Sequence, residues 1–162
     1  MIVYQENKRE FLHDVRLDLI EEKIEKRVKE VLHKNTARNE YVSWMNSMQY
    51  MYKVMEDKRI PDNSKIAIEY RIPNSNKRVD FIISGEDAVV IELKQWQEIE
   101  KVQTKEAIVK TYLQGRLVET THPSYQAWSY VSMIEDYNED VRKYKIKLQP
   151  CAYLHNYRLR DN

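Results

Sequence analysis

The sequence predicts an α/β fold, a sandwich whose central mixed sheet contains an antiparallel hairpin and is flanked by helices. Apolar residues recur at helical intervals over residues 6–33 and 38–57. Runs rich in β-branched residues follow between residues 65 and 93, and the proline at position 123 opens another helical stretch. Because the strand-like runs are apolar on both faces, we expect helices on both sides of the sheet. The 162 residues suit a single domain spanning residues 1–162.

The N-terminal helical region is amphipathic and dense in charge. Residues 6–33 indicate one long helix or two consecutive helices, with acidic and basic residues alternating along the polar face. Such alternation is typical of a solvated helix face rather than a nucleic-acid-binding stripe. The next helix, over residues 38–57, carries a stripe that we expect in the core: Tyr41, Trp44, Met45, Met48, Met51, Tyr52 and Met55.

Strands are expected over residues 65–72, 78–84 and 88–93. The turn Gly85-Glu86-Asp87 makes the last two of them a β-hairpin. Farther along the chain the pattern is weaker, with a second hairpin over residues 108–121, a helix over 123–139 and a last strand over 145–153. Pro150 inside that last strand favours an edge position or a bulge.

Composition limits the classes of function. Charged residues make up 33% of the chain, yet the net charge is only +1, so there is no global basic surface for tight non-specific nucleic-acid binding. One cysteine excludes an intramolecular disulfide, and no apolar run reaches the ~20 residues of a membrane span, which predicts a cytoplasmic protein without a membrane partner. With two glycines the chain has no Gly-rich phosphate loop, and its histidines lack zinc-ligand spacing.

The predicted first hairpin carries three charged side chains in apolar surroundings. If its loop has three residues, Ser84 pairs with Ala88, and Asp80 falls opposite Glu92. Lys94 lies two residues after the glutamate and therefore projects from the same face. Like charges directly opposed destabilise a sheet, and a hard divalent cation held between two carboxylates is the commonest reason to keep them. Mg²⁺ or Mn²⁺ is the expected cofactor, with the lysine placed to steady a nucleophilic water or a developing phosphate charge.

The competing interpretation treats these three charges as solvated residues of an amphipathic hairpin. The surrounding apolar residues oppose it: Val79, Phe81 and Ile83 are expected on one face, while Ile82 and Val90 share the face of the charges. Charges within a sheet that is covered on both sides are expected in a cleft or at a strand end. A register slip of one residue would move the aspartate to the other face and remove the site.

The spacing also resembles that of a known family. Asp80, eleven residues, then Glu92-x-Lys94 across a hairpin is the signature of the PD-(D/E)xK nuclease superfamily, although Arg78-Val79 stands where a proline usually precedes the aspartate. Gln126-Ala-Trp-Ser-Tyr130 resembles the Gln-x-x-x-Tyr motif of the RecB-like branch. Further sequence segments resemble the N-terminal nuclease-like module of bacterial Schlafen-type superfamily 1 DNA/RNA helicases. These segments are Ile68-Glu-Tyr-Arg-Ile-Pro73, Lys77-Arg-Val-Asp-Phe81 and Ile91-Glu-Leu-Lys-Gln-Trp96.

The resemblance implies a restriction-endonuclease-like fold and metal-dependent hydrolysis of nucleic-acid phosphodiester bonds. Asp80, Glu92 and the backbone carbonyl of Leu93 would hold the metal, and Lys94 would position or activate the attacking water. The chain would then be the N-terminal fragment of a longer protein with a covalently linked helicase domain. DNA is favoured over RNA as the partner, and a homo-oligomer is a further expectation.

Two more positions belong to the implied catalytic set. Gln126 and Tyr130, one helical turn apart, would orient the substrate phosphate and the lysine by hydrogen bonds. From the residues alone, burial of Tyr130 beside Trp128 and Met133 explains that tyrosine equally well. His122, just before this helix, could bind phosphate, act as a base or cap the helix.

Glu40 and Glu69 are further candidates for the metal. Glu40 stands near the start of the second helix, where the family often places an extra acidic ligand, but an N-terminal glutamate is also favoured by the helix macrodipole. Glu69 lies within a predicted strand, where carboxylates are depleted, and could wall the active site or support the metal ligands.

Two rival functions stay open. A nuclease-fold module can be catalytically inactive and bind nucleic acid or a partner protein. A structural interaction domain could use the twelve tyrosines and three tryptophans as anchors. Cationic residues near the proposed site are few, which predicts weak nucleic-acid binding by this chain alone: Arg71, Lys77, Arg78 and Lys94.

Overall fold

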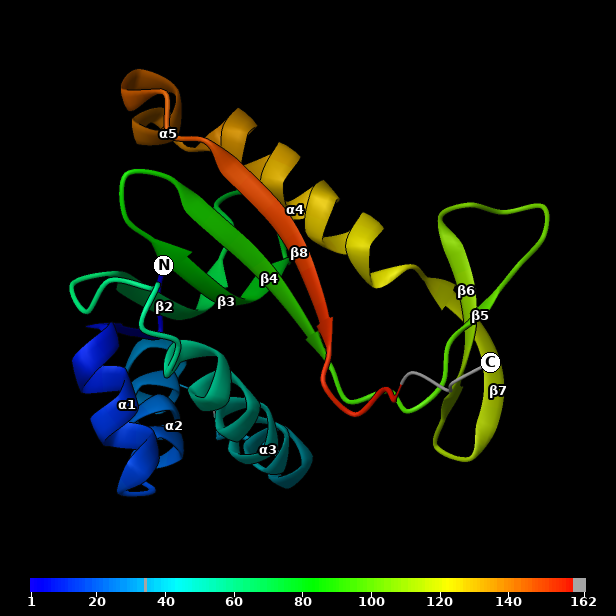
Figure 1. Cartoon of the computed structure of the whole chain (residues 1–162), viewed down its shortest axis with the longest axis horizontal. Coiled ribbons are helices and arrows are strands. Elements are labelled where there is room, and N and C mark those ends of the chain that lie inside the picture. Colours follow the sequence, from blue (N-terminus) through cyan, green and yellow to red (C-terminus); the bar gives the residue numbers. More distant parts are fainter. Residues whose placement is uncertain (34, 159–162) are drawn as a thin grey trace.

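A five-stranded mixed sheet forms the centre of the computed structural model, which describes residues 1–33 and 35–158. Its strands, in spatial order, are β1 (Tyr4–Asn7), β2 (Lys65–Arg71), β3 (Arg78–Ser84), β4 (Ala88–Lys94) and β8 (Leu148–Leu154). The helices are α1 (Lys8–Arg16), α2 (Ile20–Leu32), α3 (Arg38–Met55), α4 (Pro123–Tyr137) and α5 (Glu139–Tyr144). Figure 1 shows α1–α3 on one side of the sheet and α4 with α5 on the other, so the predicted mixed α/β class is confirmed.

The N-terminal region contains a short strand followed by two helices. β1 pairs antiparallel with β2, so helix α1 begins at Lys8 rather than at residue 6. The side chain of Asn7 accepts a hydrogen bond from the Glu10 N–H at 3.0 Å and caps this helix. The chain turns at Asp18, whose φ of 54° is left-handed, and this turn separates α1 from α2.

Helix α3 buries a narrower stripe than its sequence predicts. Trp44, Met48, Met51 and Met55 are buried against the sheet and the first two helices. Met45 is 43% exposed, so its expected place in the core is wrong. It lies one position beyond Trp44, where the helical turn of about 100° per residue already carries a side chain off the buried face.

The second core lies between the sheet and α4. Val131 and Ile134 of this helix pack with Val90 of β4. The predicted helix over 123–139 ends at Tyr137, because Asn138 is extended and its side chain accepts hydrogen bonds from the Asp140 and Val141 N–H groups of α5. At the other end His122 acts as a cap, since its Nδ1 accepts the Ser124 N–H at 3.1 Å. No helix within residues 1–33 or 35–158 has the length and apolar character needed to cross a membrane.

The regular alternation of side chains between the two faces of the sheet is broken near Glu69. Strict alternation would place Val79 beside Phe81 and Ile83, but Val79 packs beneath α4 whereas Phe81 packs beneath α1–α3. The expectation that these three residues share one face is therefore wrong for Val79. Glu69 has a φ of 56°, and its two neighbours in β2, which alternation would put on one face, pack on opposite faces.

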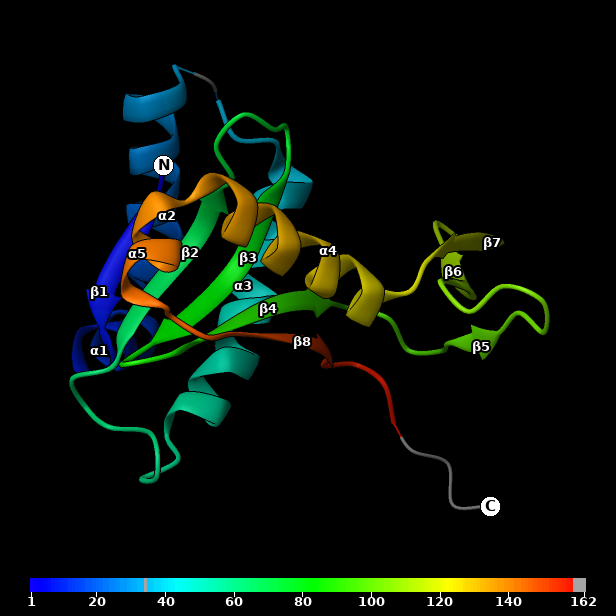
Figure 2. The ribbon, with the colours of Figure 1, turned by 90° about the horizontal axis from the view of Figure 1, so that it is seen from above.

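A separate three-stranded sheet extends beyond the N-terminal end of α4. It consists of β5 (Glu100–Lys101), β6 (Ile108–Leu113) and β7 (Arg116–Thr121). The predicted hairpin is confirmed, with Gln114 and Gly115 both at positive φ in its two-residue turn. Figure 2 shows this sheet set apart from the five-stranded sheet.

The last strand of the central sheet has the edge position that Pro150 predicts. β8 lies at the edge of the sheet and runs parallel to β4, with Pro150 opposite Val90. An edge strand tolerates proline because one side of the strand needs no ladder hydrogen bonds. This strand and α4 both lie against β4, which places helix and strand around the charged hairpin.

Candidate functional site

The charged residues meet where β3 and β4 begin to separate. The predicted pairing of Ser84 with Ala88 is confirmed, and the ladder runs to Phe81 opposite Ile91. Asp80 and the glutamate that follows Ile91 come next in this register. There the Leu93 N–H donates to the Asp80 carboxylate at 2.8 Å, so a side chain takes the place of a backbone partner. The end of this hairpin is therefore built to hold a carboxylate between its strands.

Glu92 is the centre of a network of hydrogen bonds. Its Oε1 accepts from Lys94 Nζ at 2.6 Å and from Gln126 Nε2 at 2.8 Å. The same Gln126 nitrogen donates to the Tyr130 hydroxyl at 2.6 Å. The structure thus brings together Asp80, Glu92, Lys94, Gln126 and Tyr130, all of which line one cavity.

Tyr130 combines the two roles that its sequence left open. Its ring is buried in the core beneath α4, whereas its hydroxyl accepts from Gln126 and borders the cavity. Burial raises the pKa of this phenol, which therefore keeps its proton at neutral pH. The neighbouring Trp128 is half exposed and is not part of that core.

The two carboxyl groups at the centre hold their protons unusually tightly. Burial raises the pKa of Asp80, against the opposing effects of the Leu93 N–H, Lys94 and Arg78. Burial and repulsion by Asp80 raise the pKa of Glu92 to about 7, although Lys94 acts in the opposite direction. A cation bound near the pair would act in the same direction as Lys94 and lower both pKa values.

One oxygen of this network is left without a donor. Glu92 Oε2 is buried and has no hydrogen-bond partner among the described residues. Desolvating a carboxylate oxygen without a partner is costly, so a native structure is expected to supply a proton, a water or an ion there.

The cavity around the pair is rich in cations. Its volume is about 430 Å³, and it lies between the β2–β3 turn, the end of β4 and helix α4. Its basic lining residues are the four that the sequence placed near the site: Arg71, Lys77, Arg78 and Lys94. Arg78 and Lys94 are paired with acidic residues, so among the described residues Arg71 and Lys77 are the cations of this lining that can attract an anion.

Glu40 and Glu69 lie on the other side of Arg78. The Arg78 guanidinium pairs with Glu40 and, at 2.8 Å, with Glu69. Trp44 also donates its indole N–H to Glu69 at 2.9 Å. Burial raises the pKa of Glu69 to about 7, opposed by Arg78 and by the Trp44 hydrogen bond. Both candidates are thus engaged in holding Arg78 rather than turned toward Glu92.

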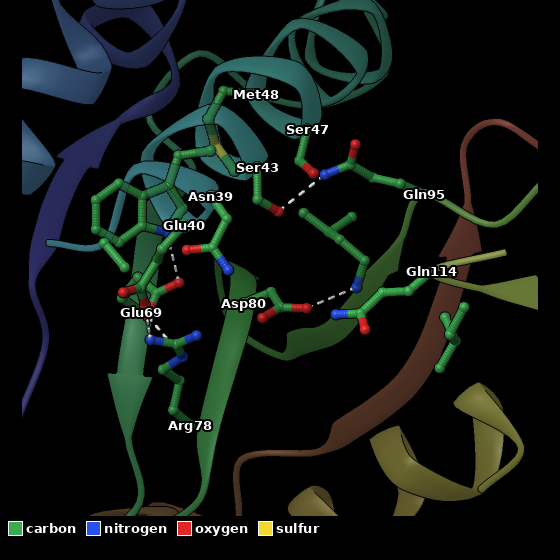
Figure 3. A pocket seen from close by; sticks show the side chains of 14 residues that line it. Asn39, Glu40, Ser43, Ser47, Met48, Glu69, Arg78, Asp80, Gln95 and Gln114 are labelled. Carbon is green, nitrogen blue, oxygen red and sulfur yellow. Dashed lines mark hydrogen bonds and ion pairs between the residues drawn. The ribbon is translucent and has the colours of Figure 1, made fainter. Parts of the chain in front are cut away.

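A second, larger cavity opens on that side. Its volume is about 740 Å³, and it shares Arg78, Asp80 and Leu93 with the first cavity. Figure 3 shows Asn39, Gln95 and Gln114 around it, from α3, from the segment after β4 and from the β6–β7 turn. The sequence carries no signal for these amides, because they come from three segments far apart in the chain.

The residues present fit a hard divalent cation in part. Asp80 and Glu92 supply oxygen ligands of the kind that Mg²⁺ and Mn²⁺ prefer, and Glu92 Oε2 is free to bind one. Within residues 1–33 and 35–158, however, no group of three or more His, Cys, Asp and Glu side chains is placed to hold a metal. A metal at this site would therefore rest on two carboxylates, a backbone oxygen and groups from solvent or substrate, as Mg²⁺ sites often do.

Neither family models nor curated proteins nor solved structures show a match to this chain. Its function therefore has to be argued from the geometry and chemistry of the site itself.

Proposed function

We propose that the chain is a metal-dependent nuclease domain with a restriction-endonuclease-like fold of the RecB-like branch, hydrolysing phosphodiester bonds of nucleic acid. One observation carries the proposal: a carboxyl pair made of the half-buried Asp80 and the buried Glu92, with Lys94 on one glutamate oxygen and the other glutamate oxygen unpartnered. The resemblance of the motif spacing is independent support.

The metal ligands of the proposal are Asp80, Glu92 and the Leu93 carbonyl. Mg²⁺ or Mn²⁺ bound there would lower the pKa of a coordinated water and offset the charge of the scissile phosphate. Both carboxyl groups must lose their protons to bind it, and their raised pKa values mean that this proton release accompanies metal binding.

The remaining polar groups have distinct tasks. Arg71 and Lys77 lie at the wall of the cavity and attract the phosphate. Gln126 fixes Glu92 Oε1 and is itself fixed by the Tyr130 hydroxyl. Lys94 Nζ, which now donates to Glu92 Oε1, lies where it can hold the attacking water or stabilise charge on the phosphate.

The test is cleavage of single- and double-stranded DNA and RNA with Mg²⁺, Mn²⁺ or a chelator. Lys94→Ala should lower the cleavage rate about a hundredfold or more, because it removes the charged group next to the carboxyl pair. Lys147→Ala is the matched control, since Lys147 is exposed at the opposite end of the sheet, next to the start of β8. A chelator-insensitive activity that survives Lys94→Ala would refute the proposal.

A second candidate is a module that binds nucleic acid or a partner without cutting it. It is favoured by the absence, among the described residues, of a third acidic side chain beside the pair, and by the ion pair that already occupies Lys94. Under this candidate the domain recruits nucleic acid, DNA before RNA, for a linked helicase. Binding without cleavage at millimolar Mn²⁺, unaffected by Glu92→Gln, would select it.

A further inference from the structure

The cleft around Asp80 is divided by charge. The cavity toward α4 is lined by four cationic and two acidic side chains, and two of the cations, Arg71 and Lys77, have no acidic partner among the described residues. The larger cavity toward α3 has Arg78 as the cation of its lining, and Glu40 and Glu69 are already paired with it. An anionic group is therefore attracted to the first cavity and repelled from the second.

The larger cavity is instead lined by neutral hydrogen-bonding groups. Asn39 and Gln114 have no side-chain hydrogen bond within the part of the chain that the structure describes, and both are exposed. Figure 3 shows both side chains turned into the cavity near Asp80, from different elements. A third amide, Gln95, is fixed in place by its hydrogen bond to Ser43 at 2.8 Å.

Apolar surfaces complete the walls of this cavity. Leu93 and Leu113 lie on its lining, and Met48 and the buried Trp44 lie at the α3 wall. A volume of about 740 Å³ falls within the range of small-molecule sites, roughly 300–1,000 Å³. Flat, neutral, hydrogen-bonding ligands match such a combination of amides and apolar walls.

We infer that this cavity is a binding site for an unpaired nucleobase of the substrate. The inference rests on the proposed function and adds to it a site for the nucleotide beside the cleaved bond. The two cavities share Arg78, Asp80 and Leu93, so a ligand with one anionic and one neutral aromatic end can span them. A nucleotide has these two ends, with its phosphate toward Arg71 and Lys77 and its base toward Asn39 and Gln114.

The site has a consequence for the form of the substrate. Side-chain amides can pair with the Watson–Crick edge of a base, and that edge is free only when the base has left its duplex partner. A base held in this cavity is therefore single-stranded or turned out of the helix. Base-paired nucleic acid would present its phosphates to the first cavity and leave the second empty.

Comparing an oligonucleotide that has bases with one that lacks them distinguishes the contributions of the two cavities to binding. The 162-residue chain is titrated in a chelator, so that no cleavage occurs, with a short oligothymidylate and with an abasic oligomer of equal length. We expect the oligothymidylate to bind about tenfold more tightly, because only it can contact the amides. A blunt duplex should bind like the abasic oligomer, and oligouridylate tests whether RNA is accepted equally.

The variant that locates the site is the double substitution Asn39→Ala with Gln114→Ala. It should bring the affinity for oligothymidylate close to that for the abasic oligomer and leave the latter unchanged. Gln49→Ala, an exposed glutamine on the same helix as Asn39 but outside the cavity lining, should change neither. Both substituted positions are exposed, and circular dichroism verifies that the variants fold.

The outcomes separate this inference from the proposed nuclease activity. Equal affinity of the wild-type chain for the two oligomers overturns the base site, and so does a tenfold preference that survives the double substitution. Base-dependent binding without Mg²⁺- or Mn²⁺-dependent cleavage would sustain the site while the nuclease proposal fails. Cleavage without base-dependent binding would support the nuclease proposal and overturn the base site.

Discussion

Gln126 on α4 donates a hydrogen bond to Glu92 on β4 at 2.8 Å, and this bond joins the helix to the charged end of the hairpin. The amide leaves the charge of the pair unchanged while it fixes which glutamate oxygen faces Lys94. A helix-borne amide thus sets the orientation of a strand-borne carboxylate.

Removing this amide should lower cleavage more than it lowers stability. Gln126→Ala leaves Glu92 Oε1 with Lys94 as its remaining donor, and we expect the cleavage rate to fall about tenfold to a hundredfold, the range for positioning groups around metal ligands. Ser132→Ala, at a half-buried position on the same helix outside the cavity lining, is the control. Initial rates with saturating Mn²⁺ measure the effect; an unchanged rate would show that the amide has no part in the reaction.

Metal binding should stabilise the folded chain through the carboxyl pair. A ligand that binds only the folded state raises its stability, by roughly 2.7 kcal/mol at a hundred times the dissociation constant. We therefore expect millimolar Mn²⁺ to raise the melting temperature of the wild type but not of Asp80→Asn or Glu92→Gln. Glu40→Gln should keep most of the shift, because Glu40 pairs with Arg78. A shift that persists in Glu92→Gln would place the metal elsewhere.

Without metal, the raised pKa of Glu92 should make the chain less stable as pH rises. The unfolded chain releases this proton near the ordinary value of 4.5, whereas the folded chain releases it near 7. Between these values the folded state holds more protons, so the free energy of unfolding falls with rising pH and the loss is complete above about pH 7. Glu92→Gln has no such proton and should be the more stable chain at about pH 8, by about 1–3 kcal/mol.

This difference should shrink toward zero as the pH approaches 4.5. Urea unfolding in a chelator at several pH values measures it, with the exposed turn variant Glu86→Gln as control. A Glu92→Gln variant that is less stable than the wild type at about pH 8 would mean that the ion pair with Lys94 outweighs burial.

Nucleic-acid binding by the isolated chain should be weak and only moderately sensitive to salt. The net charge is +1, and four cationic side chains line the cavity at the carboxyl pair. Counterion release from about four phosphates of a single strand gives a slope of log affinity against log salt near −3 at most. We expect a dissociation constant of micromolar or weaker at ~150 mM salt. Arg71→Gln with Lys77→Gln should flatten the slope, whereas Lys147→Gln should leave it unchanged; nanomolar binding would reveal a basic groove elsewhere.

The hairpin register was predictable because the chemistry that sets it is local. A three-residue turn beginning at Gly85 determines which residues oppose one another, and β-branched runs mark the strands on either side. The common orientation of Gln126 and Tyr130 was equally predictable, because residues one turn apart share a helix face. Short elements were missed, since β1, β5 and α5 contain too few residues to show a period.

Other parts of the site depend on non-local geometry that no window of sequence contains. The change of face at Val79 occurs in the strand that pairs with the left-handed backbone at Glu69, and a glutamate gives no signal of positive φ. The role of Arg78 between two acidic residues requires α3, β2 and β3 to be placed together. The amide-lined cavity likewise exists only once the β6–β7 turn has been brought next to α3.

Glu69 combines a strained backbone with a side chain that holds two residues of the cleft. Its left-handed backbone costs a non-glycine residue roughly 1–2 kcal/mol, and glycine would remove that strain. The same exchange would leave Trp44 without its acceptor and Arg78 with one acidic partner fewer. A buried donor without a partner costs about 1–3 kcal/mol, so the side-chain contacts of the acid offset the strain of its backbone, and glycine at this position would gain little stability while it loosened the wall of the cleft.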